Sequence, residues 1–220
     1  MINKKSHTPN YNNSIVIKPW GEEYVIFRNK KKISITYLKI KKGQSTSLHC
    51  HPKKKTGFLI LSGKAEVQLG IYKKNTFTYK PMSILVLRAG LFHKIKASKY
   101  QDLYALEIEN PYIKKDLVRM EDVYGRKNKD YESLSKTKKI TKKNTVFKLP
   151  TLNHKHIYNL NVASACLKIN FTSTGSLPLP IYKNIKSPPI TYLLYFYLST
   201  SNRNLKHCLN LISHRKSFLK

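Results

Sequence analysis

Between residues 14 and 110 the chain is a succession of short apolar segments separated by turn residues, and this pattern constrains the fold more than any other feature. Segments such as SIVIK, ISITYLKI, GFLILSG and LYALEIE are alternating or continuously apolar over short runs, which is typical of β-strands. No convincing helical period appears in this region. The spacing of the segments is typical of a sandwich or barrel and not of βαβ units. We therefore predict an all-β fold.

The composition changes after this region and divides the chain into three parts. Residues 14–127 are predicted to form the β-barrel domain, and one short helix is expected within it around residues 116–123. Residues 128–144 are rich in lysine and other polar residues, as in a linker. Residues 145–220 form a basic, poorly defined C-terminal segment, for which a degraded second domain and a disordered tail are both open interpretations.

The charge of the chain is strongly unbalanced, with a formal net charge of +31 from 42 basic and 11 acidic residues. All the acidic residues lie between Glu22 and Glu132. Such a charge attracts nucleic acids and anionic membranes. The positive charge is spread evenly and no nucleic-acid motif accompanies it, and the abundance of Lys, Asn, Ile and Tyr is the mixture expected from an AT-rich coding sequence. We expect no specific nucleic-acid partner, and a basic nucleic-acid-binding protein is the least favoured interpretation.

The cysteines and the apolar runs of the sequence indicate a cellular compartment. Cys50, Cys166 and Cys208 show no paired spacing, so a disulfide framework or a cysteine zinc site is not expected. The N-terminus lacks the apolar stretch of a secretory signal. The longest apolar run, residues 190–200, is shorter than the roughly 20 residues of a membrane span. We expect a cytoplasmic protein without a membrane partner.

The stretch HCHPKKKTG, residues 49–57, carries the chemistry of greatest interest. In a strand, His49 and His51 project to the same side while Cys50 points away. Two imidazoles that lie close together can clamp a metal ion. The alternative is an ordinary pair of strand histidines followed by a solvated lysine loop.

The positions of glycines and a third histidine around this stretch favour the metal clamp. The sequence resembles the cupin superfamily in the spacing of six residues: Gly43, His49, His51, Gly63, Gly90 and His93. The resemblance implies a double-stranded β-helix, which is a jelly-roll-like barrel. It also implies that His49, His51 and His93 converge on one divalent metal ion.

Two departures from the family pattern affect this expectation. The position of the family's glutamate ligand is Thr56, and the position of its proline is Arg88. The implied site is then three neutral imidazoles with water, a set that can hold Zn, Fe, Ni, Co or Mn. Threonine is a poor replacement for a carboxylate, so the affinity for a hard ion should be lower.

Three longer stretches narrow the resemblance. KPWGEEY at 18–24, SLHCHPKKKTGFLILSGKAEV at 47–67 and DLVRMEDVYGR at 116–126 resemble the cupin domain of type II mannose-6-phosphate isomerases, which is often fused to a mannose-1-phosphate guanylyltransferase. The resemblance implies an aldose-ketose isomerase that acts on a phosphorylated sugar in polysaccharide precursor metabolism. It also implies a homodimer.

The resemblance suggests roles for further residues. Arg119 and Arg126 match the family's arginines and would bind phosphate or the enediolate, because a guanidinium recognises oxyanions through two hydrogen bonds. Glu107 is the candidate general base. Lys53, Lys54 and Lys55 could reach a substrate phosphate at the mouth of the barrel. The alternative for these three lysines is a solvated loop.

Two other carboxylates are candidates for the general base, and a second function is also possible. Glu109 shares a strand face with Glu107 by the period of two, and Glu22 is a further candidate base. The loss of a glutamate at Thr56 favours a second function, a non-catalytic sugar-binding cupin module.

Overall fold

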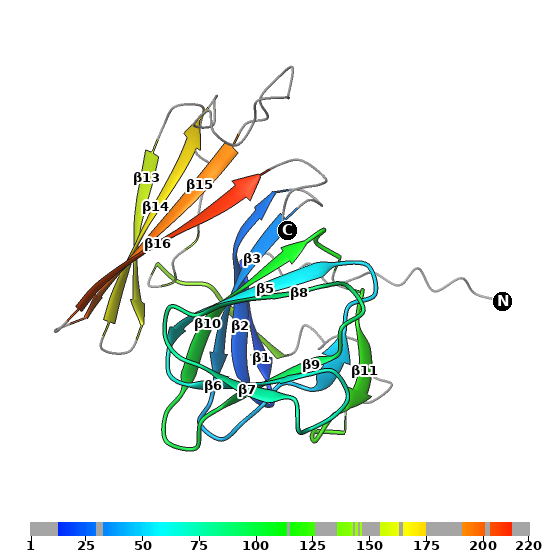
Figure 1. The fold of residues 1–220 in the computed structure, drawn as a ribbon. Helices are drawn as coiled ribbons and strands as arrows, with labels where there is room; N and C mark the ends of the chain where they lie inside the picture. The colour runs from blue at the N-terminus through cyan, green and yellow to red at the C-terminus, as the bar shows by residue number, and fades with distance from the viewer. Residues whose placement is uncertain are drawn as a thin grey trace.

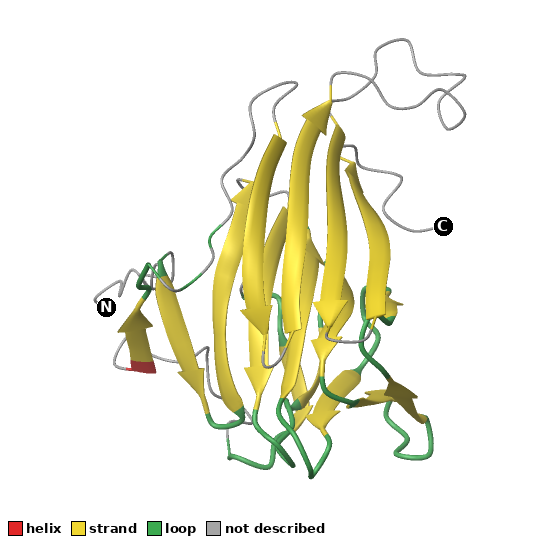
Figure 2. Cartoon of the chain, turned by 90° about the vertical axis from the view of Figure 1, so that its left-hand side faces the viewer, coloured by secondary structure: helices red, strands yellow, loops and turns green. Residues whose placement is uncertain are grey.

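The computed structural model describes 13–29, 33–113, 115–125, 136–142, 144 and 146, and the backbone of 155–162, 165–174, 191–200 and 203–212. The regular structure of the described part is almost entirely β-strand (Figure 2). The short helical piece drawn in red is 3₁₀ at residue 136, and the described residues contain no α-helix. They therefore also lack a helix with the length and apolar character needed to cross a membrane. The expectation of an all-β fold is confirmed.

The first antiparallel sheet has seven strands. In spatial order they are β12 (Thr137–Lys139), β1 (Ser14–Lys18), β2 (Gly21–Asn29), β3 (Ile33–Ile40), β10 (Leu103–Asn110), β5 (Lys55–Ser62) and β8 (Ile84–Leu87). The second sheet has five strands, in the order β11 (Val118–Glu121), β4 (Leu48–Cys50), β9 (His93–Ala97), β6 (Ala65–Leu69) and β7 (Thr76–Tyr79). Figure 1 shows the two sheets facing each other as the walls of a barrel.

The barrel interior is filled by side chains from both sheets. Phe58, Ile60 and Ala105 from the seven-stranded sheet share one buried cluster with Val67 and Ile95 from the five-stranded sheet. This arrangement is the cupin-type jelly roll that the glycine and histidine spacing predicts.

The seven-stranded sheet carries an apolar cluster on each face. In β5, Phe58 and Ile60 belong to the inner cluster, whereas Leu59 and Leu61 belong to a second cluster on the outer face. The period of two in a strand produces this division. Strands buried on both faces read as continuous apolar runs, which explains the sequence GFLIL.

The predicted strand segments between residues 14 and 110 all contain strands of the structure. The predicted helix at 116–123 is wrong, because β11 (Val118–Glu121) occupies this segment and pairs with β4. The pairing with β4 satisfies backbone groups of this short segment across the sheet, whereas a helix satisfies them locally. Strand β12 lies within the stretch 128–144 that the composition assigns to a linker, and it pairs with β1.

The backbone described after residue 154 forms a separate antiparallel sheet. Its four strands are β13 (Lys155–Val162), β14 (Ala165–Thr174), β15 (Thr191–Thr200) and β16 (Arg203–Ile212), in sequence order. The stretch SACLKINFTST, which is rich in apolar and β-branched residues, contains β14.

Candidate metal centre and cavity

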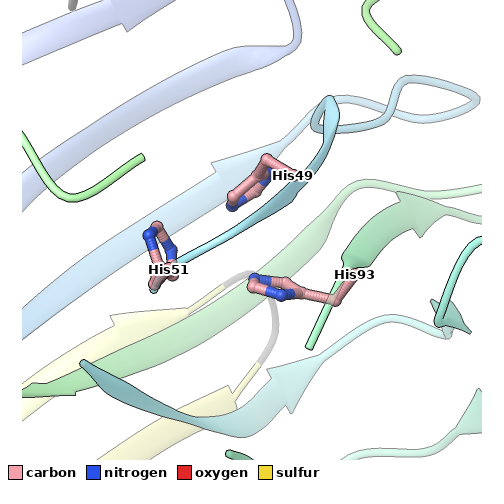
Figure 3. A group of neighbouring side chains, drawn as sticks. All are labelled: His49, His51 and His93. Atoms are coloured by element: carbon pink, nitrogen blue, oxygen red, sulfur yellow. The ribbon is translucent and has the colours of Figure 1, made fainter. Parts of the chain in front are cut away.

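Two neighbouring strands of the five-stranded sheet bring the three histidines together. His49 on β4 lies directly opposite His93 on β9, and His51 follows β4 with the period of two that returns its side chain to the same face. The ring centroids are 4.4 Å apart for His49 and His93, 5.0 Å for His49 and His51, and 5.4 Å for His51 and His93. Figure 3 shows the rings pointing toward a common space.

Backbone carbonyl groups hold each ring by its Nδ1 atom. Nδ1–H of His51 donates to the carbonyl oxygen of Asp116 at 2.5 Å, that of His93 to Leu91 at 3.0 Å, and that of His49 to Ser47 at 2.8 Å. A carbonyl oxygen only accepts, so each Nδ1 carries the proton and each Nε2 keeps its lone pair in the neutral ring. This is the tautomer that metal-binding histidines adopt.

The electrostatic environment keeps these rings neutral. Burial, with a smaller contribution from the ammonium of Lys54, lowers the pKa of His51 to about 3 and that of His93 to about 4. Burial, followed by the charges of His93 and His51, lowers the pKa of His49 well below its usual value. Neutral imidazoles offer their lone pairs at neutral pH, as metal binding requires.

The histidine group fits a divalent ion. One nitrogen from each of His49, His51 and His93 lies within 4.8 Å of the other two. Nε2 of His51 and of His93 is buried and makes no hydrogen bond. Because a buried polar atom normally has a partner, these two nitrogens indicate that a ligand belongs between them.

Carboxylates from the opposite sheet complete the cavity. Glu107 and Glu109 follow Leu103 and Ala105 on β10 at intervals of two, and these apolar residues belong to the inner cluster. The shared face of the two glutamates therefore looks into the barrel. Ligand atoms of His51, Glu107 and Glu109 lie within 4.8 Å of one another, so His51 belongs to both groups.

Lys54 reaches into this cavity. The Lys54 side chain is buried, and its ammonium donates to Oε1 of Glu109, while the hydroxyl of Ser34 donates to Oε2 at 3.0 Å. The carboxylate of Asp116 holds the loop by accepting from the backbone N–H groups of Lys53 and Lys54, at 2.9 and 3.0 Å. The middle lysine of the three is thus fixed in the interior.

Three further charged side chains line the cavity. Lys18 and Glu23, both buried, form an ion pair at 3.6 Å. Arg119 on β11 lies directly opposite His49 on β4, and it lines the cavity together with Trp20. Cationic groups, carboxylates and neutral imidazoles therefore line one cavity, an arrangement suited to a small polar ligand.

The structure separates the other candidate residues. Lys53 and Lys55 are exposed and are not among the residues that line the cavity. Arg126 lies outside the described residues. Thr56 is buried, and its Oγ1 has no hydrogen-bond partner. The carboxylate position that the cupin resemblance places at residue 56 therefore holds a short, unpaired hydroxyl.

Sequence reasoning grouped Lys54 with the flanking lysines at the mouth of the barrel, whereas the structure buries it. A signal for the middle lysine was available, because Lys54, Thr56 and Phe58 alternate on β5 and its preceding residue, and Phe58 is an inner-face residue. No comparable local signal marks Asp116, which contacts residues more than 60 positions away in the sequence.

Comparison with known proteins decides the family. The family model described as mannose-6-phosphate isomerase C-terminal matches residues 4–122. The chain belongs to this family of cupin domains. The predicted resemblance to the type II mannose-6-phosphate isomerase cupin is thereby confirmed.

Relatives of this cupin include two polysaccharide biosynthesis proteins. The xanthan biosynthesis protein XanB of Xanthomonas campestris pv. campestris is 29% identical over 117 residues, which are 50% of this chain and 23% of that protein. The alginate biosynthesis protein AlgA of Pseudomonas putida is 26% identical over 131 residues, which are 57% of this chain and 25% of that protein. The chain thus spans about a quarter of the length of the curated relatives it matches.

Solved structures with a similar fold include KdgF from Halomonas sp. and the capsular polysaccharide assembling protein CapF from Staphylococcus aureus. KdgF has a TM-score of 0.40 and 15% identity, and covers 44% of this chain and 85% of its own. CapF has a TM-score of 0.44 and 15% identity, and covers 49% of this chain and 34% of its own.

Proposed function

We propose that this cupin binds a divalent metal ion through His49, His51 and His93 and isomerises a phosphorylated sugar, as a mannose-6-phosphate isomerase does. The observation that carries the proposal is the convergence of three neutral imidazoles, each fixed by its Nδ1. Membership of the mannose-6-phosphate isomerase C-terminal family supports the substrate class. The ion is one of Zn, Fe, Ni, Co or Mn.

Aldose-ketose isomerisation needs a base, a stabiliser of negative charge and a site for the phosphate. A bound divalent ion supplies a Lewis acid that polarises the sugar carbonyl. Glu107 takes the proton from C2 of the open-chain sugar and returns it to C1. The guanidinium of Arg119, which lines the same cavity, donates hydrogen bonds to the oxygen that becomes negative.

The phosphate would lie at the mouth of the cavity. Lys53 and Lys55 are exposed on either side of the buried Lys54, and they can follow a flexible ligand without moving the barrel. Arg126 joins this group in the proposal because it matches the family's arginine in the sequence YGR. The substrate would then carry its reacting carbons inward and its phosphate outward.

A non-catalytic sugar-binding module is the second candidate. The specific observation in its favour is Thr56, a buried residue where the cupin pattern has a carboxylate ligand. The same cavity would then bind a sugar without turning it over.

Metal analysis and an isomerase assay test the proposal together. Purified wild-type protein should carry a divalent ion that His51→Ala lacks, and it should interconvert mannose 6-phosphate and fructose 6-phosphate. Glu107→Gln should lower kcat by about 10²–10⁴-fold. Glu66→Gln, at an exposed glutamate paired with Lys96, is the matched control and should keep full activity.

Two results would contradict the isomerase. Equal metal content in wild type and His51→Ala would remove the histidine site. Sugar-phosphate binding without turnover, in the presence of each of the five ions, would favour the sugar-binding module instead.

A further inference from the structure

Thr56 occupies the position of the cupin glutamate ligand, and a carboxylate lies next to it on the neighbouring strand. Thr56 on β5 and Glu109 on β10 are direct partners in the antiparallel ladder. Directly opposite residues of an antiparallel pair project from the same face of the sheet, with their side chains adjacent. The Glu109 carboxylate therefore enters the cavity beside the position where the cupin pattern places its glutamate ligand.

Glu109 is also within reach of the histidine group. Its carboxylate and a ring nitrogen of His51 lie within 4.8 Å of each other, and His51 is within the same limit of His49 and His93. Ser34 fixes one carboxylate oxygen from the far side of the ladder. The carboxylate is thus buried, fixed by Ser34 and close to His51, the imidazole that the two ligand groups share.

We propose that Glu109 supplies the carboxylate ligand that Thr56 lacks, and that the ammonium of Lys54 competes with the metal ion for Glu109. This inference rests on the metal site of the proposed function and deepens it. The competition is one of charge, because each carboxylate oxygen has two lone-pair positions and can accept more than one partner. An ion of charge +2 and the buried ammonium would repel each other strongly in this enclosed space.

Lys54 then has a defined task. It neutralises Glu109 when the ion is absent, which allows a carboxylate to stay buried in the barrel. When the ion binds, it takes over that role and Lys54 turns toward the mouth of the cavity. Lys53 and Lys55, the residues on either side of it in the sequence, are exposed.

Titration with Mn²⁺ alone tests the inference, because this hard ion depends most on a carboxylate ligand. Free Mn²⁺ is measured by its electron paramagnetic resonance signal, so no enzymatic activity is needed. Lys54→Met should bind Mn²⁺ at least about tenfold more tightly than wild type, and Glu109→Gln at least about tenfold more weakly. Combining the two substitutions should abolish the gain from Lys54→Met, because the competition requires Glu109.

Matched controls separate this effect from general charge. Lys55→Met removes the same charge from an exposed position one residue away, and Glu66→Gln removes a carboxylate from an exposed ion pair. Both should bind Mn²⁺ as wild type does. Equal affinities for Lys54→Met and Lys55→Met, or for Glu109→Gln and wild type, would overturn the inference.

A measurement on the wild-type chain covers the case in which Lys54→Met does not fold. Acetic anhydride labelling, read by mass spectrometry, should modify Lys54 faster in saturating Mn²⁺ than without it, relative to the exposed Lys53. Labelling of Lys54 that Mn²⁺ leaves unchanged would contradict the competition. Mn²⁺ binding that His51→Ala abolishes and Glu109→Gln leaves intact would refute the inference and leave the proposed function standing. Failure of all five ions, Zn, Fe, Ni, Co and Mn, to bind wild type would refute both.

Discussion

Gly63 lies at a position where a larger residue should destabilise the fold. Its φ is +86°, and a Cβ atom would lie 2.4 Å from the carbonyl oxygen of Asp102. We predict that Gly63→Ala lowers the free energy of unfolding by about 2–4 kcal/mol, because the left-handed backbone and the backbone clash both oppose it. Urea denaturation at 25 °C measures the change.

Gly43 provides the control for this prediction. Its φ is +73°, but a Cβ atom would meet nothing within 4 Å. Gly43→Ala should therefore cost only the conformational part, about 1 kcal/mol. Equal losses for the two variants would show that the approach of the Asp102 backbone is not what requires glycine at residue 63.

Individual side chains also show what the sequence could predict about the site. The shared side of His49 and His51 follows from strand geometry alone. The inward direction of Glu107 and Glu109 does not, because it depends on Leu103 and Ala105 packing against the opposite sheet. Whether a charged residue faces inward is a property of the closed barrel.

Strand β10 combines the two requirements of the barrel in one element. Its inner face carries Glu107 and Glu109, and its outer face carries Leu106 and Ile108 in the second apolar cluster. Leu106 is fully buried and lies opposite Tyr37 on β3 and Leu59 on β5. One face of β10 therefore lines the cavity, and the other face packs in the outer apolar cluster.

This division predicts that stability and binding can be separated in β10. Leu106→Ala should lower the free energy of unfolding by about 2–5 kcal/mol, since it leaves a cavity in the outer cluster. Val86→Ala on the edge strand β8, where 39% of the residue is exposed, should change it by no more than about 0.5 kcal/mol. Chemical denaturation gives both values.

The folded fraction of Leu106→Ala should still bind the metal ion, because its side chain points away from the cavity. A loss of ion affinity beyond the unfolded fraction would contradict the separation of the two faces.

Elements differ in how far local sequence determines them. The segments from β1 to β10 carry their own period of two or a continuous apolar run, so they are visible without the fold. In β11, by contrast, Val118 and Met120 are exposed, and the pairing of Arg119 with His49 fixes the strand. A short edge strand that depends on pairing with a strand far away in the sequence cannot be told from a short amphipathic helix by its own residues alone.

At the scale of the molecule, the cavity draws its groups from both walls of the barrel. The histidines belong to the five-stranded sheet and its adjoining loop, whereas Glu107, Glu109 and the ion pair of Lys18 with Glu23 belong to the seven-stranded sheet. The large positive charge of the whole chain therefore does not describe this interior, where acidic and basic side chains are paired.

Because the ligand groups come together only in the closed barrel, the ion should stabilise the whole fold. A ligand that binds only the native state raises the free energy of unfolding by about 2.7 kcal/mol at a free concentration of 100 times its dissociation constant. We predict a rise of this size in wild type on addition of Zn²⁺, and its reversal by a chelator. In His93→Ala the rise should largely disappear, whatever the stability of the variant without the ion. Thermal unfolding over a range of Zn²⁺ concentrations measures the rise in both proteins. A rise of equal size in both proteins would mean that Zn²⁺ stabilises the fold at a place that does not involve His93.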